Sequence, residues 1–206
     1  MKLFHYSGNC RFNKVLKTSA RPSISLIVLL LARILILPSF AAAETKKVYS
    51  PSGELLIEAN IENGKLEGIS KIYYESGKLE VEENYKNGKR EGLAKSYFES
   101  GELQSERNFI NCKAEGISKT YYESGELQKK SNYKNNKQEG ISKIYYESGH
   151  LSGEMNFKND KLEGISKTYH ENGEYQFIDT YKNGIKINRK AYTEEGQLKF
   201  DQDYPE

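Results

Sequence analysis

The chain has 206 residues, of which 12% are aromatic and 29% charged, with a formal net charge of +2. Residues 1–43 carry six basic side chains and no acidic one, which leaves residues 44–206 with 25 basic against 29 acidic groups, a net charge of −4. This acidic balance argues against nucleic acid as a partner, because phosphate binding relies on a dominant basic field.

The first 43 residues have the pattern of an export signal. Basic residues precede an apolar run at 24–37, and three alanines at 41–43 follow it, so we expect cleavage after Ala43. Roughly 14 residues is short for a bilayer span, which needs about 20. We predict a signal peptide over 1–43 and an exported domain over 44–206, in the periplasm, at the cell surface or secreted. An uncleaved anchor is the alternative, and it too would leave the repeats outside the cytoplasm.

From residue 49 onwards the chain repeats a unit of 24 residues. Glycines and Glu-Gly pairs recur with this period: Gly53, Gly77, Gly101, Gly125, Gly149 and Gly173; Glu67-Gly68, Glu91-Gly92, Glu115-Gly116, Glu139-Gly140 and Glu163-Gly164. A fixed period of this length is typical of an array of identical supersecondary units, each of which needs its neighbours to bury its apolar side chains.

Each unit has the pattern of a β-hairpin. In residues 68–91, runs rich in β-branched and aromatic residues alternate with two turn signals, Glu-Ser-Gly at 75–77 and Asn-Gly at 87–88. Asn-Gly between such runs is a strong hairpin signal, and the close spacing of the turns leaves no room for an amphipathic helix. The predicted fold is all-β: an elongated, twisted, single-layer antiparallel sheet of repeated hairpins.

A pair of aromatic residues in each unit splits into two columns. The first column is unbroken: Tyr73, Tyr97, Tyr121, Tyr145, Tyr169 and Tyr192. The second column drifts: Tyr74, Phe98, Tyr122, Tyr146 and His170. A three-residue loop at 75–77 would place Tyr73 beside Leu79, and a two-residue loop would place Tyr74 there; serine followed by glycine favours the first. Successive strand residues face opposite sides, so the drifting column is our predicted partner-binding face, for which tyrosine is well suited.

Lysine forms a further column: Lys71, Lys95, Lys119, Lys143, Lys167 and Lys190. One interpretation is solubilising charge whose methylene groups lie over tyrosine rings. The alternative is a cationic stripe that binds an acidic partner or an anionic lipid surface.

Residues 85–92 (YKNGKREG) and 73–79 (YYESGKL) resemble MORN repeats, in the bacterial variant found in YwqK-family antitoxins. The resemblance covers about residues 47–204. It implies an elongated sheet of hairpins that serves as a protein- or lipid-binding scaffold, and the YwqK grouping implies neutralisation of a secreted toxin by binding. The chain departs from many MORN repeats in having no tryptophan, and from an antitoxin in having a predicted export signal.

Catalytic and cofactor-binding patterns are missing from the sequence after residue 43. His150 and His170 do not recur in other units, and no Cys/His cluster has metal-ligand spacing. There is also no phosphate-binding glycine loop and no serine-nucleophile motif. We therefore expect a non-enzymatic protein without cofactor or metal, whose partner is a toxin or an envelope protein, or, in the alternative, a structural or lipid-associated envelope scaffold.

Overall fold

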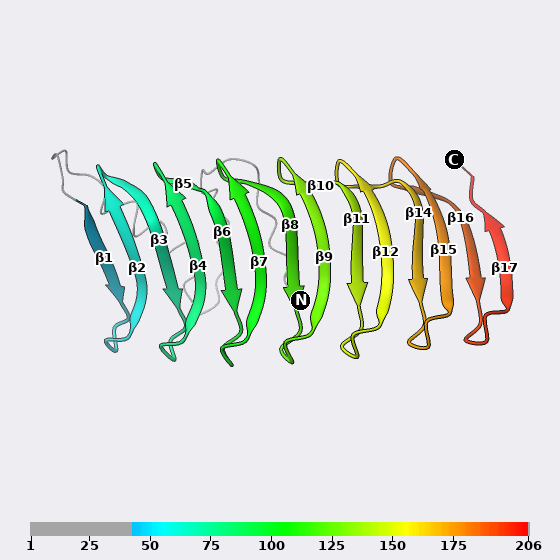
Figure 1. Cartoon of the computed structure of the whole chain (residues 1–206), viewed down its shortest axis with the longest axis horizontal. Helices are drawn as coiled ribbons and strands as arrows, with labels where there is room; N and C mark the ends of the chain where they lie inside the picture. Colours follow the sequence, from blue (N-terminus) through cyan, green and yellow to red (C-terminus); the bar gives the residue numbers. More distant parts are fainter. Residues whose placement is uncertain (1–42, 206) are drawn as a thin grey trace.

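The structure is a computed structural model that describes residues 43–205. The predicted signal peptide lies outside this range, apart from Ala43. The described residues form one sheet of seventeen strands (Figure 1). The strands are β1 (Glu44–Tyr49), β2 (Leu55–Glu62), β3 (Lys65–Tyr73), β4 (Leu79–Lys86), β5 (Lys89–Arg90), β6 (Gly92–Tyr97), β7 (Leu103–Ile110), β8 (Lys113–Tyr121), β9 (Leu127–Lys134), β10 (Lys137–Gln138), β11 (Gly140–Tyr145), β12 (Leu151–Lys158), β13 (Lys161–Leu162), β14 (Gly164–Tyr169), β15 (Tyr175–Lys182), β16 (Ile185–Tyr192) and β17 (Leu198–Asp203).

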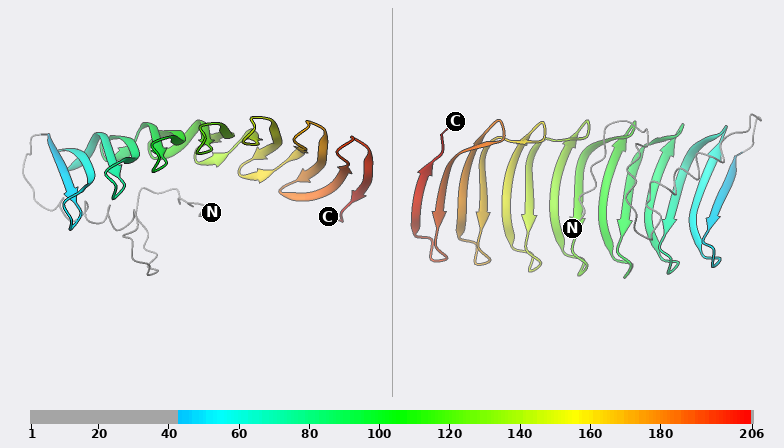
Figure 2. Two further views of the ribbon diagram at one scale, coloured as in Figure 1. Left: turned by 90° about the horizontal axis from the view of Figure 1, so that it is seen from below. Right: turned by 180° about the vertical axis from the view of Figure 1, so that it is seen from behind.

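The strands pair antiparallel with their neighbours along the chain, as a meander of hairpins. The hairpins stand side by side in a single open layer that arches along its length (Figure 2). The segments β5, β10 and β13 have two residues each, and one glutamate separates each from the longer strand that follows. The all-β, single-layer prediction is therefore confirmed. No helix within residues 43–205 is long and apolar enough to cross a bilayer.

The two turn types of the hairpin also follow the prediction. Asn87 and Gly88 both have positive φ, +52° and +75°, as a two-residue hairpin turn requires. At the other end the Tyr74 amide donates to the Lys78 carbonyl at 2.8 Å, and Gly77 has φ +79°. These contacts close a three-residue loop over 75–77.

This loop places Tyr73 opposite Leu79. The register that we predicted is confirmed, and it recurs in the other units: Tyr97 opposite Leu103, Tyr121 opposite Leu127, Tyr145 opposite Leu151, Tyr169 opposite Tyr175 and Tyr192 opposite Leu198.

The sheet has two faces of different character. One carries the lysine column together with the glutamates opposite it, such as Lys71 and Glu82, and we call it the lysine face. The other carries Ser70 and its counterparts in later units, and we call it the serine face. The residues with less than a tenth of their surface exposed lie on the serine face: Ile57, Ala59, Ile61, Phe109, Ala114, Ser118, Ser131, Ser142, Gly153, Ser166, Asp179 and Ala191.

The glutamates of the Glu-Gly pairs join each unit to the next. Each accepts a hydrogen bond at 2.6–2.9 Å from the backbone N–H of an asparagine 20 residues later: Glu67 from Asn87, Glu91 from Asn111, Glu115 from Asn135, Glu139 from Asn159 and Glu163 from Asn183. A carboxylate that accepts from a backbone amide makes a charge-assisted hydrogen bond. The recurrence of this pair therefore has a structural cause, which is the joining of neighbouring hairpins.

Candidate binding surfaces

The drifting aromatic column lies at the loop end of the hairpins, and its side chains reach to the next unit. The Tyr74 hydroxyl donates to the Tyr97 carbonyl at 2.7 Å. Tyr122 and Tyr146 donate in the same way to Tyr145 and Tyr169, at 2.8 and 2.6 Å, and His170 Nε2 lies 3.5 Å from the Tyr192 carbonyl. All five members of the column, Tyr74, Phe98, Tyr122, Tyr146 and His170, are half-buried. These contacts give the column a structural role that sequence reasoning had assigned only to the unbroken column.

The lysine column lies in a row of alternating charges that crosses the whole sheet. In strand order the row reads Lys47, Glu58, Lys71, Glu82, Lys95, Glu106, Lys119, Lys130, Lys143, Glu154, Lys167, Ile178, Lys190 and Asp201, each opposite the next. Ion pairs form along it at Lys47–Glu58 (3.2 Å), Lys71–Glu82 (4.0 Å), Lys119–Glu106 (2.6 Å), Lys143–Glu154 (2.9 Å) and Lys190–Asp201 (3.2 Å). The predicted cationic stripe is thus accompanied by carboxylates along most of its length.

Ion pairing shifts the pKa of two glutamates in the row, and burial shifts that of a tyrosine beside it. The hydrogen bond from Lys119 lowers the pKa of Glu106, and that from Lys143 lowers the pKa of Glu154. Burial, followed by the nearby Glu154 charge, raises the pKa of Tyr169 to about 12. At neutral pH Glu106 and Glu154 carry a negative charge, so they offset Lys119 and Lys143.

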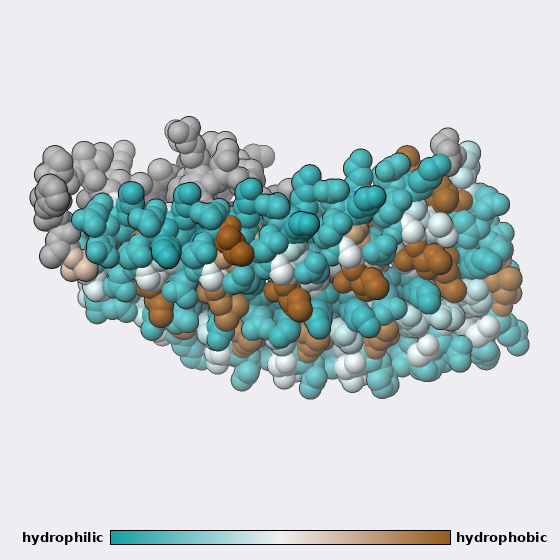
Figure 3. All heavy atoms as spheres, turned by 45° about the horizontal axis from the view of Figure 1, so that its top comes forward, coloured by the Kyte–Doolittle hydropathy of each residue, from teal (hydrophilic) through white to brown (hydrophobic). Residues whose placement is uncertain are grey.

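An exposed aliphatic column lies beside this row on the lysine face, and sequence reasoning missed it. Its members directly follow the glycine of each Glu-Gly pair, and between 43% and 60% of their surface is exposed: Ile69, Leu93, Ile117, Ile141 and Ile165. Hydrophobic side chains recur at regular intervals along the array, with hydrophilic ones between them (Figure 3). Members of adjacent units are two strands apart, or about 10 Å. The sequence does contain this column, as an aliphatic residue that recurs with a period of 24.

Beyond each end of the aliphatic column, a polar residue holds the equivalent position in the next unit of the array. Thr45 holds the equivalent place on β1, opposite Asn60, and Asn188 holds it on β16, opposite Thr180. Within the column an asparagine or threonine lies opposite each aliphatic residue, for example Asn132 opposite Ile117. At this position of the unit, exposed aliphatic side chains are therefore confined to the five inner units.

The serine face differs from one unit to the next. One of its columns reads Ala59, Glu83, Arg107, Ser131, Met155 and Asp179. Asp179, which is 7% exposed, accepts two hydrogen bonds from Arg189, both 2.7 Å long, and Lys186 lies 2.9 Å from it. Burial alone would raise the pKa of Asp179, but these two cations lower it. On this face Asp179 is therefore satisfied by two cations, Arg189 and Lys186.

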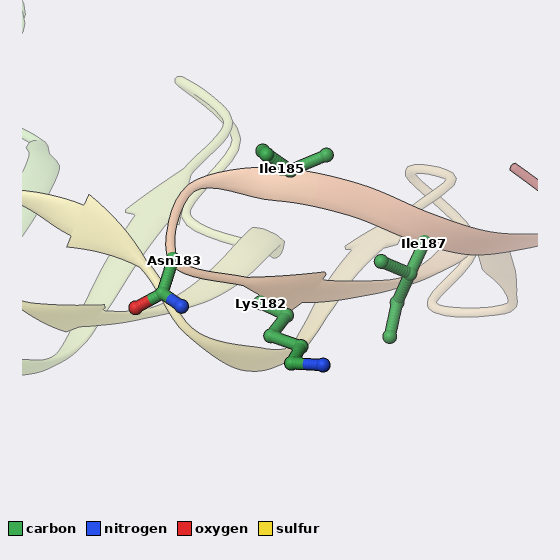
Figure 4. Close-up of a pocket in the computed structure, with 4 residues that line it drawn as sticks. All are labelled: Lys182, Asn183, Ile185 and Ile187. Carbon is green, nitrogen blue, oxygen red and sulfur yellow. The ribbon is translucent and has the colours of Figure 1, made fainter. Parts of the chain in front are cut away.

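A catalytic centre does not emerge from the described residues. Across residues 43–205 there is no group of three or more His, Cys, Asp or Glu side chains that could hold a metal ion. A hollow at the last Asn-Gly turn is lined by Lys182, Asn183, Ile185 and Ile187 (Figure 4). His150 lies in a different unit, with Nδ1 2.9 Å from the Glu171 carbonyl oxygen. The hollow therefore brings together an amine, an amide and two aliphatic side chains, without an acid–base pair.

An open single-layer array of β-hairpins, joined through recurring glutamate and tyrosine contacts, defines a repeat scaffold. The chain belongs to the MORN repeat variant family, whose model matches residues 66–87, 90–111, 114–135, 138–159 and 162–183. Comparison with curated proteins finds no match. Each matched segment contains one member of the aliphatic column, whereas Thr45 and Asn188 lie outside the matched segments.

Proposed function

We propose that this chain is an exported, non-catalytic scaffold that binds a partner protein through the aliphatic column of its lysine face. The observation that carries the proposal is the exposure of Ile69, Leu93, Ile117, Ile141 and Ile165 at the same position of five consecutive units. Exposed apolar surface that recurs in this way, bordered by polar residues, is typical of a protein interaction site.

In its finer form the proposal makes the partner a toxin that the scaffold neutralises by binding, as the resemblance to YwqK-family antitoxins implies. We predict export from the pattern of residues 1–43. An exported chain would meet such a partner outside the cytoplasm. The drifting column of Tyr74, Phe98, Tyr122, Tyr146 and His170 remains a second candidate surface. The tyrosine hydroxyl groups of the drifting column already donate hydrogen bonds to the next unit. The aliphatic column, which lies within the described residues, makes no such contacts and is therefore our first choice.

The test uses a variant that changes polarity without changing strand preference. Ile117→Thr combined with Ile141→Thr removes the two central apolar groups, and threonine keeps a β-branched side chain suited to a strand. Affinity purification from cells that produce the tagged protein should recover a stoichiometric partner with the wild type and lose it with this variant. Ile185→Thr is the matched control, because Ile185 is 57% exposed but lies at the last turn, outside the column.

Two results would contradict the proposal. The first is recovery of the same partner in equal amount with the double variant, provided that its thermal unfolding matches the wild type. The second is flotation of the wild-type protein with anionic vesicles at low salt, lost at high salt, without a protein partner. That second result would support a lipid-associated scaffold that uses the lysine column.

A further inference from the structure

The alternation of charges on the lysine face fails at Ile178 on β15, where an apolar residue replaces the acid, and at Lys130 near the middle of the array, where a like charge does. Lys130 on β9 stands opposite Lys119 on one side and Lys143 on the other. In the other units from β2 to β12 the same position holds an acid: Glu58, Glu82, Glu106 and Glu154. Three lysines are therefore adjacent where the period predicts Lys-Glu-Lys.

The neighbours of Lys130 do not compensate for the missing acid. Lys119 is paired with Glu106 at 2.6 Å and Lys143 with Glu154 at 2.9 Å, so both ammonium groups reach away from Lys130. Lys130 itself is exposed, and among residues 43–205 it has no ion pair or hydrogen-bond partner. Like charges directly opposite one another destabilise a sheet. Folding alone therefore gives no reason for a lysine here.

The three lysines lie next to the centre of the aliphatic column. Ile117 is two residues before Lys119, and Ile141 is two residues before Lys143, so all four side chains share the lysine face. These isoleucines are 51% and 60% exposed. The surface thus combines three exposed or half-exposed cations with two apolar groups, and Asn132 and Gln128 flank Lys130 along its own strand.

We propose that Lys130, with Lys119 and Lys143, forms a carboxylate-binding site that takes an acidic segment of the partner protein. A glutamate or aspartate of that segment would pair with Lys130, which lies between Lys119 and Lys143 and has no carboxylate partner of its own among the described residues, whereas they are paired with Glu106 and Glu154. Apolar side chains of the same segment would pack on Ile117 and Ile141. The proposal rests on the proposed function, because it names the chemistry of the partner at the centre of the same surface.

A partner protein fits this site better than a polyanion does. Residues 44–206 have a net charge of −4, so a nucleic acid would meet an opposing field over most of the array. A short acidic segment requires only a local positive surface, and the flanking isoleucines match the apolar residues that a protein segment carries.

The experiment measures binding of a fluorescein-labelled peptide of alternating glutamate and leucine residues to the purified full chain. A peptide with glutamine in place of glutamate is the control ligand. Lys130→Gln should weaken binding of the acidic peptide about tenfold and leave the glutamine peptide unchanged. Ile178→Glu is the matched control, since it also lowers the net charge by one and lies in the same row, on β15. It should leave binding within about twofold of the wild type.

Lys130→Glu separates binding from folding. It restores Lys-Glu-Lys, so its melting temperature should rise above that of the wild type while binding of the acidic peptide is lost. Equal affinity of wild type and Lys130→Gln for the acidic peptide would overturn the site. The site would also be overturned if the chain bound anionic vesicles more strongly than the acidic peptide and if this binding depended on Lys130. If the peptide test fails in either way but the double variant Ile117→Thr, Ile141→Thr still loses the partner, the carboxylate site is wrong and the proposed function stands.

Discussion

The lysine face and the serine face of this sheet satisfy their charges in different ways. On the lysine face one arrangement, lysine opposite glutamate, is repeated from unit to unit and stays half-exposed, as at Lys119 and Glu106. On the serine face the only acid with less than a tenth of its surface exposed, among the described residues, is Asp179, which is held by Arg189 and Lys186. The repeated ion pairs of the lysine face are thus many and weak, whereas Asp179, a departure from the repeat on the serine face, makes one strong contact.

This difference shows where a repeat scaffold can change. A weak exposed pair can be lost in one unit at small cost, and Lys130 stands where such a pair is missing. A buried acid cannot be lost so easily, because its cationic partners would remain without a counter-charge. We therefore expect the serine face near β15 and β16 to set stability, and the lysine face to be free to set recognition.

Asp179→Asn should give the largest loss of stability. The amide keeps the size of the side chain but removes the charge that Arg189 and Lys186 share, so the free energy of unfolding should fall by about 2–3 kcal/mol. Equilibrium unfolding in urea measures this change. A loss no larger than that of an exposed pair would remove the contrast between the two faces.

The pH dependence gives an independent check on Asp179. The pKa of Asp179 is lowered in the folded state, so its contribution is present above the unfolded-state pKa of about 4 and is lost as the pH falls through the folded value. As the pH is lowered from 5, the free energy of unfolding of the wild type should therefore fall by more than that of Asp179→Asn. Parallel pH profiles of the two proteins would contradict this assignment.

The sequence predicted the hairpin itself, because the residues that direct it act locally. Asn87 and Gly88 tolerate positive φ, and Gly77 closes the other loop, so the register of Tyr73 against Leu79 followed from turn chemistry alone. Contacts between units were not predictable in this way. The reach of the Tyr146 hydroxyl to the Tyr169 carbonyl depends on how far adjacent hairpins are offset, which no local pattern encodes.

The aliphatic column was missed for a different reason. Its members have the period of the array, whereas the predicted binding residues were departures from that period. Their exposure depends on which face is packed, and this became visible only when buried residues such as Ser142, 1% exposed, were located on the opposite face.

Tyr146→Phe should have an intermediate effect, because it removes one contact that recurs between units. The Tyr146 hydroxyl donates to the Tyr169 carbonyl at 2.6 Å, and its loss should reduce the free energy of unfolding by about 1 kcal/mol. The chain offers the reverse change as a control, since Phe98 occupies the equivalent position without a hydroxyl. Phe98→Tyr should stabilise the protein; if it has no effect, the tyrosine contact is not a general joint between units.

Glu106→Gln should have the smallest effect of the three. The amide oxygen can still accept from the Tyr121 hydroxyl, which lies 3.1 Å from Glu106, while the ion pair with Lys119 is lost. An exposed pair of this kind contributes about 0.5 kcal/mol, and salt screens it. Urea unfolding in 1 M salt should therefore abolish the effect of Glu106→Gln but retain most of that of Asp179→Asn. Equal sensitivity to salt in the two variants would mean that the serine face is as accessible to ions as the lysine face, and that burial does not separate their energetics.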